Sequence, residues 1–211
     1  MLAFSAINNN DKVGAVFFSD KVEAYIPPKK GREHVLYIVR HLLTIEPKRK
    51  GTSLSEVIRF FNHSARQKAI VFMLSDFLDG NGSSPAGSGA GGPAAGTGTP
   101  PSGRPILSFE DALKVAGKKH DMIGIKVYDK MDMQLPRIGM IEAEDSETGG
   151  RHWVDTNDYL VQTNYQQYFF NQTEQCKGIF QKAGCDLLHL RTDEDYVKIL
   201  QRFFVGRHRP G

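Results

Sequence analysis

The sequence predicts an α/β fold of three layers, in which a mainly parallel β-sheet lies between two layers of helices. Short apolar runs of the kind found in buried strands, such as 69–74, alternate along the chain with segments in which apolar residues recur every three or four positions. Strands that alternate with helices favour a parallel sheet with helices on both faces. The chain has 211 residues, of which 40% are hydrophobic and 24% charged, so it is long enough to form one such core.

Each element is expected from its own local pattern. The helices are the segments with one buried apolar stripe, expected at 32–45, from about 53 onward, at 108–120, at 157–183 and at 193–205. The strands are expected at 13–18, 22–26, 69–74, 122–128, 138–142, 152–154 and 186–190, and a hairpin joins 138–142 to 152–154. The strand at 69–74 is apolar on both sides, as in a strand that is covered on both faces.

The first residues look like the middle of a domain. An apolar helix end at 2–7 runs without a cap into the strand at 13–18. Such a helix normally follows a strand on which it packs, and a folded α/β domain seldom opens on the tail of one. We therefore expect that a strand upstream of Met1 is missing, and that the sheet is truncated at its N-terminal side.

The whole chain, 1–211, is expected to be a single domain with one insertion. From 80 to 105 the composition changes to Gly, Pro, Ser, Ala and Thr, with nine of the 21 glycines and five of the ten prolines of the chain. Such a segment cannot bury enough apolar surface to offset its ordering entropy, so we predict that 80–105 is disordered.

Composition excludes several classes of protein. The net charge of +3 is mild, and its short basic clusters lack interleaved aromatic residues, which argues against nucleic-acid binding. Two cysteines, Cys176 and Cys185, are too few for a disulfide framework or a zinc site. The longest apolar run is far too short to span a membrane, and no signal peptide is apparent. We expect a cytoplasmic protein.

Two polar positions fall where an open parallel sheet binds its ligands, beyond the carboxyl ends of the strands. Asp76 directly follows the strand at 69–74, and Thr52 lies in the loop that opens the preceding helix. A carboxylate and a hydroxyl at one sheet edge suit Mg²⁺, which takes oxygen ligands and keeps several waters. The alternative interpretation is structural, because Ser53 to Glu56 also forms a capping-box pattern that starts a helix.

A series of short motifs then runs in a set order along nearly the whole chain, apart from 80–105. They are Ala3-Phe4-Ser5-Ala6-Ile7, Asn10-Asp11-Lys12-Val13-Gly14, Phe18-Ser19-Asp20, Ile26-Pro27-Pro28-Lys29-Lys30-Gly31, Leu74-Ser75-Asp76-Phe77, His120-Asp121, Val127-Tyr128-Asp129, Glu147-Thr148-Gly149, Trp153-Val154-Asp155-Thr156 and Arg191-Thr192-Asp193-Glu194-Asp195-Tyr196-Val197. With these motifs the chain resembles the C-terminal, von Willebrand factor A-like part of the domain of unknown function 58 family of bacterial proteins.

The resemblance implies a Rossmann-like sheet of the von Willebrand factor A type with a metal-ion-dependent adhesion site. Thr52 matches the threonine and Asp76 the second aspartate of that site, whereas the Asp-x-Ser-x-Ser motif of the first strand is absent from the chain. In this family the missing strand lies in the middle of the sheet, between the strands at 13–18 and 69–74. The resemblance also implies a MoxR-type AAA+ ATPase as partner, a role in protein assembly or maturation, and no catalytic residues.

The leading hypothesis is therefore a non-catalytic protein-interaction module with an incomplete metal site that holds Mg²⁺ weakly. The alternatives are a Mg²⁺-dependent hydrolase that uses Asp76, or a non-functional truncated remnant. An enzyme needs a nucleophile or general base beside the metal, and no second carboxylate or histidine occurs in the loops at 51–53 and 75–76. With two strand edges unpaired, we expect the isolated chain to be marginally stable or prone to aggregation.

Overall fold

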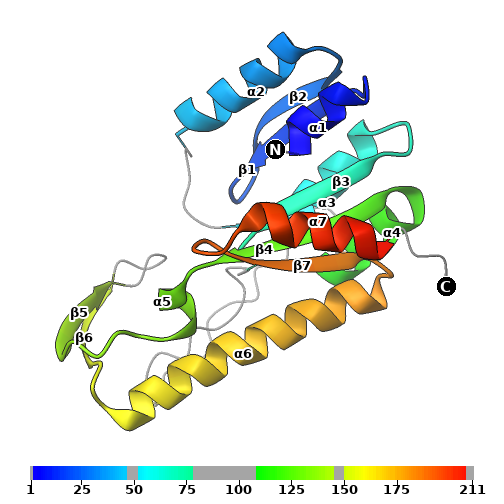
Figure 1. Cartoon of the computed structure of the whole chain (residues 1–211). Coiled ribbons are helices and arrows are strands. Elements are labelled where there is room, and N and C mark those ends of the chain that lie inside the picture. Colours follow the sequence, from blue (N-terminus) through cyan, green and yellow to red (C-terminus); the bar gives the residue numbers. More distant parts are fainter. Residues whose placement is uncertain (1, 47–51, 78–107, 145–149, 208–211) are drawn as a thin grey trace.

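The computed structural model describes residues 2–46, 52–77, 108–144 and 150–207 (Figure 1), so the insertion predicted at 80–105 lies outside the described residues. The helices are α1 (Leu2–Asn8), α2 (Arg32–Thr44), α3 (Leu54–Ser64), α4 (Phe109–Lys119), α5 (Lys130–Met133), α6 (Tyr159–Lys182) and α7 (Tyr196–Arg207). The strands are β1 (Val13–Phe18), β2 (Val22–Lys29), β3 (Ile70–Ser75), β4 (Asp121–Tyr128), β5 (Met140–Glu144), β6 (Arg151–Asp155) and β7 (Asp186–Arg191). Most expected elements are present, with ends shifted by one to three residues.

The central sheet has three parallel strands in the order β3-β4-β7. Its two faces are covered by helices. On one face Phe204 of α7 packs edge-on against Phe72 of β3, with ring centroids 6.0 Å apart. Met73, whose side chain lies on the opposite face because successive residues of a strand alternate, belongs to the core that α3, α4 and α6 form. The predicted α/β arrangement, with a parallel sheet between helices, is therefore confirmed for these strands.

The first two strands form a second, separate sheet. β1 and β2 pair antiparallel, and within the described residues no strand hydrogen-bonds to both β1 and β3. Phe18, at the end of β1, nevertheless packs against the main core. Figure 1 shows β1 and β3 running toward the same side of the molecule. The two strands that were expected to lack a shared neighbour thus each have one edge without a strand partner in the described part of the chain.

The prediction that the strand at 69–74 is covered on both faces is wrong at its two ends. Ile70 is 65% exposed and Leu74 is 56% exposed, whereas Met73 is buried. Ile70, Phe72 and Leu74 share one face of β3, and Phe72 contacts α7, whereas Ile70 and Leu74 are largely exposed. An apolar composition on both sides therefore did not guarantee burial on both sides.

The main core lies between the sheet and the helices α3, α4 and α6. It contains the side chains of Leu54 and Ile58 from α3, Leu113 and Ala116 from α4, and Phe180 from α6. All five are at most 2% exposed. Burial of a side chain of this kind stabilises the fold by about 1.5–3 kcal/mol, so this face of the sheet supplies most of the apolar stabilisation.

The hairpin of β5 and β6 projects away from the sheet beside the start of α6 (Figure 1). Its base is fixed by Thr156, which is fully buried. The Thr156 hydroxyl donates to the carbonyl oxygen of Gly139 at 2.8 Å and accepts from the N–H of Ile138 at 3.0 Å. Gln162 of α6 donates to the carbonyl oxygen of Thr156 at 2.7 Å. The hairpin is therefore held in a defined direction by buried hydrogen bonds at its root.

His120, which joins α4 to β4, makes the free energy of unfolding depend on pH. It is 2% exposed, its ring packs against Phe61 with centroids 4.9 Å apart, and neither ring nitrogen has a hydrogen-bond partner among the described residues. Burial, with a smaller contribution from Lys119, lowers the pKa of His120. Since the unfolded chain then binds more protons at low pH, the free energy of unfolding falls as the pH drops below about 6.5.

We expect His120→Leu to flatten this dependence. Urea unfolding between neutral and mildly acidic pH should show a loss of stability of up to about 1.4 kcal/mol per pH unit in the native chain from this group. His189 adds to the loss, because burial and the nearby charge of Lys126 lower its pKa too. The control is His152→Leu, because His152 is exposed. An equal pH slope in the His120→Leu and His152→Leu variants would contradict the assignment.

Candidate functional site

Asp76 stands at a sharp corner directly after β3. Its side chain is exposed, and its Oδ1 accepts a hydrogen bond from the Ser75 hydroxyl at 3.3 Å. The same hydroxyl accepts from the N–H of Phe77 at 3.0 Å. Phe77 has a φ of 54°, a left-handed conformation that non-glycine residues seldom adopt, and its buried ring lies 5.3 Å from that of Phe180. The corner therefore anchors Phe77 in the core and leaves the Asp76 carboxylate at the carboxyl edge of the sheet.

The buried ammonium group of Lys126 stabilises this corner by a hydrogen bond to its main chain. Lys126, near the middle of β4, is only 2% exposed, which is rare for a lysine. Its ammonium donates to the main-chain oxygen of Asp76 and lies 5.9 Å from the ring centroid of Phe169 in α6. Burial lowers the pKa of Lys126, and neighbouring groups that include Asp76 oppose the shift. Lys126 thus ties the backbone of Asp76 to the centre of the sheet.

Thr52 lies in a loop that is bonded to the carboxyl end of another strand, β1. It lies half-buried in the loop before α3, and the N–H of the next residue, Ser53, donates to the main-chain oxygen of Ser19 at 3.1 Å. Ser19 directly follows β1. The loop of Thr52 is therefore attached to the carboxyl end of β1, while Asp76 lies at the carboxyl end of β3. In the described part of the chain, each of these two strands has one edge without a strand partner.

The capping-box interpretation of this loop is not confirmed. Ser53 occupies the position before α3, but its side chain makes no capping hydrogen bond. Its main chain bonds to Ser19 instead. The loop is thus shaped by a contact to a distant strand, which local spacing could not reveal.

Sequence reasoning missed two residues of this edge. Ser19 was not singled out as a site residue, yet it is only 7% exposed and its hydroxyl donates to the carboxylate of Glu23 at 2.7 Å. Lys126 was counted as an ordinary residue of a strand. A lysine inside the apolar run 122–127 was the available signal, because a charge in a strand buried on both faces must find a specific partner.

The donor set at this edge is small. Thr52 offers one hydroxyl oxygen and Asp76 one carboxylate, and these are ligands of the type that Mg²⁺ prefers. Among the residues that the structure describes, no group of three or more His, Cys, Asp or Glu side chains could hold a metal ion. The residues present therefore fit part of an oxygen-ligand site but do not complete one.

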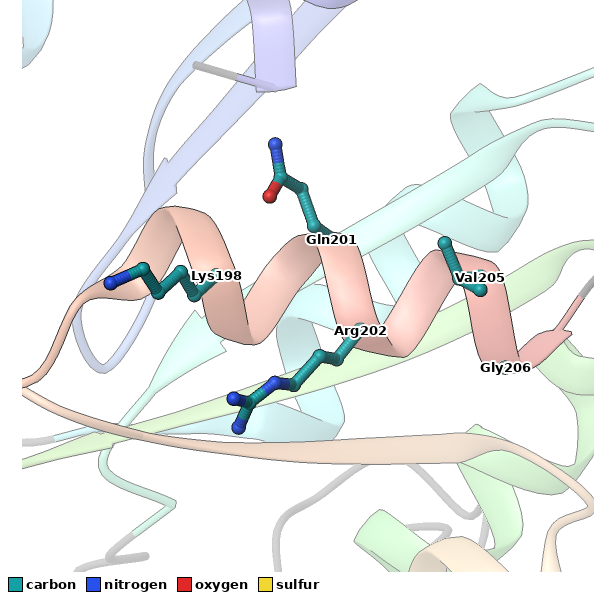
Figure 2. A pocket seen from close by; sticks show the side chains of 5 residues that line it. All are labelled: Lys198, Gln201, Arg202, Val205 and Gly206. Carbon is teal, nitrogen blue, oxygen red and sulfur yellow. The ribbon is translucent and has the colours of Figure 1, made fainter.

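A separate surface hollow of about 420 Å³ lies along α7 (Figure 2). It is lined by Lys198, Gln201, Arg202, Val205 and Gly206, which recur on one side of the helix. The hollow is remote in sequence from Thr52 and Asp76 and carries two cationic side chains. In the described ranges no helix combines the length and the apolar character that crossing a bilayer requires.

The chain is similar to proteins without an assigned function. It is 21% identical over 210 residues to uncharacterized proteins Rv1480 of Mycobacterium tuberculosis and Mb1516 of Mycobacterium bovis, which covers 99% of this chain and 58% of each relative. It is 23% identical over 186 residues to uncharacterized protein MAV169 of Mycobacterium avium, which covers 87% of this chain and 94% of that protein. The chain thus spans just over half the length of the first two relatives.

The fold also has a counterpart among solved structures. The crystal structure of the conserved hypothetical protein BatB from Bacteroides thetaiotaomicron matches with a TM-score of 0.50 and 15% identity, over 98% of this chain and 84% of BatB. At that identity the match supports the fold alone. The model of the family described as "Protein of unknown function DUF58" matches residues 1–175, which is most of the chain. This chain therefore belongs to the DUF58 family, as the motifs of its sequence indicated.

Proposed function

We propose that this chain is a non-catalytic protein-interaction module whose sheet has the von Willebrand factor A arrangement. The observation that carries the proposal is that, among the described residues, β1 and β3 each have one edge without a strand partner, with Thr52 and Asp76 at the carboxyl ends of these strands. An incomplete sheet with polar groups at its ligand-binding edge suits recognition better than turnover. The role in protein assembly or maturation is the one that the family resemblance implies.

Within the described residues, one edge of β3 has no strand beside it. The N–H of Asp121 donates to the carbonyl oxygen of Ala69 at 2.9 Å. Because parallel ladders direct the backbone groups of alternate residues to opposite sides, Ile70, Phe72 and Leu74 turn theirs away from β4, toward β1. One added strand parallel to β3 satisfies these groups. In our proposal that strand carries the Asp-x-Ser-x-Ser motif, which does not occur in the 211 residues.

Completion of the sheet also completes the cation site in this proposal. Thr52 and Asp76 would supply two oxygen ligands, and the hydroxyl and carboxylate groups of the added strand would supply others. Mg²⁺ would supply a positive centre that bridges this edge to a carboxylate of a partner protein. On the present chain, with two donors, Mg²⁺ binds weakly. The partner in this proposal is a MoxR-type AAA+ ATPase.

The test is the binding of a purified MoxR-type ATPase from the same bacterium to the immobilised chain. We expect Asp76→Asn to weaken binding, because it removes the negative charge of the carboxylate. Asp11→Asn, which changes an exposed aspartate before β1, should leave binding unchanged. Equal binding by the two variants would show that Asp76 does not take part in the interface.

The absence of catalysis is tested separately. The chain is incubated with generic phosphatase and esterase substrates in the presence of MgCl₂, and the same assay is run on Asp76→Ala. We expect no turnover above the rate of buffer, because no general base accompanies Asp76 in the proposed site. Metal-dependent turnover that Asp76→Ala abolishes would make the chain a hydrolase and overturn the proposal.

A further inference from the structure

The projecting hairpin carries an unusual exposed face. Trp153, the only tryptophan of the chain, is 67% exposed, and Met140 is 59% exposed. Trp153 lies directly opposite Glu142 in the β5–β6 ladder, so their side chains share one face. Arg151 bridges the strands through Glu144 at 3.1 Å. We call the face that contains Trp153, Met140, Glu142 and Glu144 the hairpin face.

The hairpin face is both apolar and acidic. The carboxylates of Glu142 and Glu144 share one cation, since Arg151 lies 3.1 Å from Glu144 and 4.0 Å from Glu142. Asp155, opposite Met140, adds a third carboxylate to this face. A large exposed aromatic side chain beside carboxylates is typical of an anchor in a protein interface. The partly buried hydrogen bonds of Thr156 fix the root of the hairpin, so its backbone loses less conformational entropy on docking.

The hollow on α7 has the complementary chemistry. Val205 is 64% exposed and, with Gly206, forms the apolar part of the lining, while Lys198 and Arg202 supply positive charge (Figure 2). Lys198 is paired with Asp195 at 3.3 Å, but both side chains are at least half exposed. Among the described residues Arg202 has no ion-pair partner. The hollow therefore offers an apolar floor and an available cation.

We infer that the hairpin face of one copy of this chain docks on the α7 hollow of a second copy. Trp153 fills the apolar part of the hollow beside Val205, and the carboxylate of Glu142 pairs with Arg202. In Figure 1 the hairpin lies at the far left of the molecule, away from α7, which lies over the central sheet. The hairpin therefore docks on another copy rather than on its own α7.

The two docking surfaces differ, so the contact is head-to-tail and each copy retains one free surface of each kind. Such heterologous contacts extend into open chains or rings instead of closing as a two-fold dimer. A single tryptophan buries about 150–250 Å², and interfaces well below about 1,200 Å² are weak. The association is therefore expected to be concentration-dependent and to weaken at high salt, because the charge pairs lie at the surface.

The first experiment uses the fluorescence of Trp153, since no other tryptophan contributes. As the concentration of the full chain rises, we expect the emission to shift to the blue and the mass in sedimentation velocity to increase, both less so at high salt. Trp153→Ser and Arg202→Glu should each weaken the association by about tenfold or more. Tyr37→Ser is the matched control, because Tyr37 is a 54% exposed aromatic on α2.

A mixing experiment tests the head-to-tail geometry. Arg202→Glu copies keep an intact hairpin face, and Trp153→Ser copies keep an intact hollow. Each variant alone should associate more weakly than the native chain by about tenfold or more, but a mixture should form one-to-one dimers and shift the emission of the one remaining tryptophan. Both replaced side chains lie on the surface, so both variants should fold. Circular dichroism at the temperature of the binding experiment checks this.

Three results would overturn the inference. The first is an emission spectrum that does not change with concentration. The second is association that persists unchanged in Trp153→Ser or Arg202→Glu, as contacts through the open edges of β1 and β3 would. The third is a mixture of the two variants that stays monomeric. None of these results bears on Thr52 or Asp76, so the proposed function stands or falls separately.

Discussion

Replacement of Phe180 by alanine is expected to lower the free energy of unfolding by about 3–5 kcal/mol. Phe180 is 1% exposed and lies at the centre of an aromatic cluster, with ring centroids 5.3 Å from Phe77 and 6.1 Å from Phe109. It also packs so closely on the sheet that a Cβ built on Gly124 would lie 2.5 Å from its ring. Because domains have stabilities of about 5–15 kcal/mol, this loss removes a large share of the stability, and at the low end of that range it leaves the variant close to unfolding.

The measurement is equilibrium unfolding in urea followed by circular dichroism. Phe170→Ala is the matched control, because Phe170 lies on the same helix and is 59% exposed. A surface change of that kind should cost no more than about 0.5 kcal/mol. Equal small losses in the two variants would show that α6 does not pack on the sheet as described. Phe180→Ala should also loosen Phe77, and with it the Asp76 corner.

Replacement of Leu74 by lysine is expected to raise several-fold the concentration at which the purified chain begins to aggregate. The backbone groups of Leu74 face the open edge of β3, and its side chain is 56% exposed. An unpaired apolar edge is a template for pairing with another chain, and a lysine on the edge blocks that pairing through charge and desolvation. The cost to the folded state should be within about 0.5 kcal/mol, because the side chain is already exposed.

Light scattering during slow concentration, together with a thermal melt, measures both effects. Leu43→Lys is the control, because it makes the same chemical change at an 80% exposed position of α2. If Leu43→Lys suppresses aggregation as much as Leu74→Lys, added charge and not the strand edge is responsible. A sharp, cooperative and reversible melt of the native chain as a monomer would contradict the expectation of marginal stability.

The sequence by itself determined the elements and the family. Runs such as 122–127 and the amphipathic stripe of 157–183 predicted a strand and a helix because burial imposes a period on apolar residues wherever the chain is folded. The ordered motifs indicated the DUF58 family, which the family comparison confirms. The position of Asp76 after β3 also followed from local order along the chain.

Only the tertiary structure decided which strands pair and which groups meet. Whether β3 is covered on both faces depends on neighbours that are distant in sequence, so its apolar composition could not predict the exposure of Ile70 and Leu74. The same holds for Lys126, whose ammonium reaches the main chain of Asp76 across 50 residues. Hydrophobic periodicity is a local signal of burial, whereas open edges and buried charges are properties of contacts between distant segments.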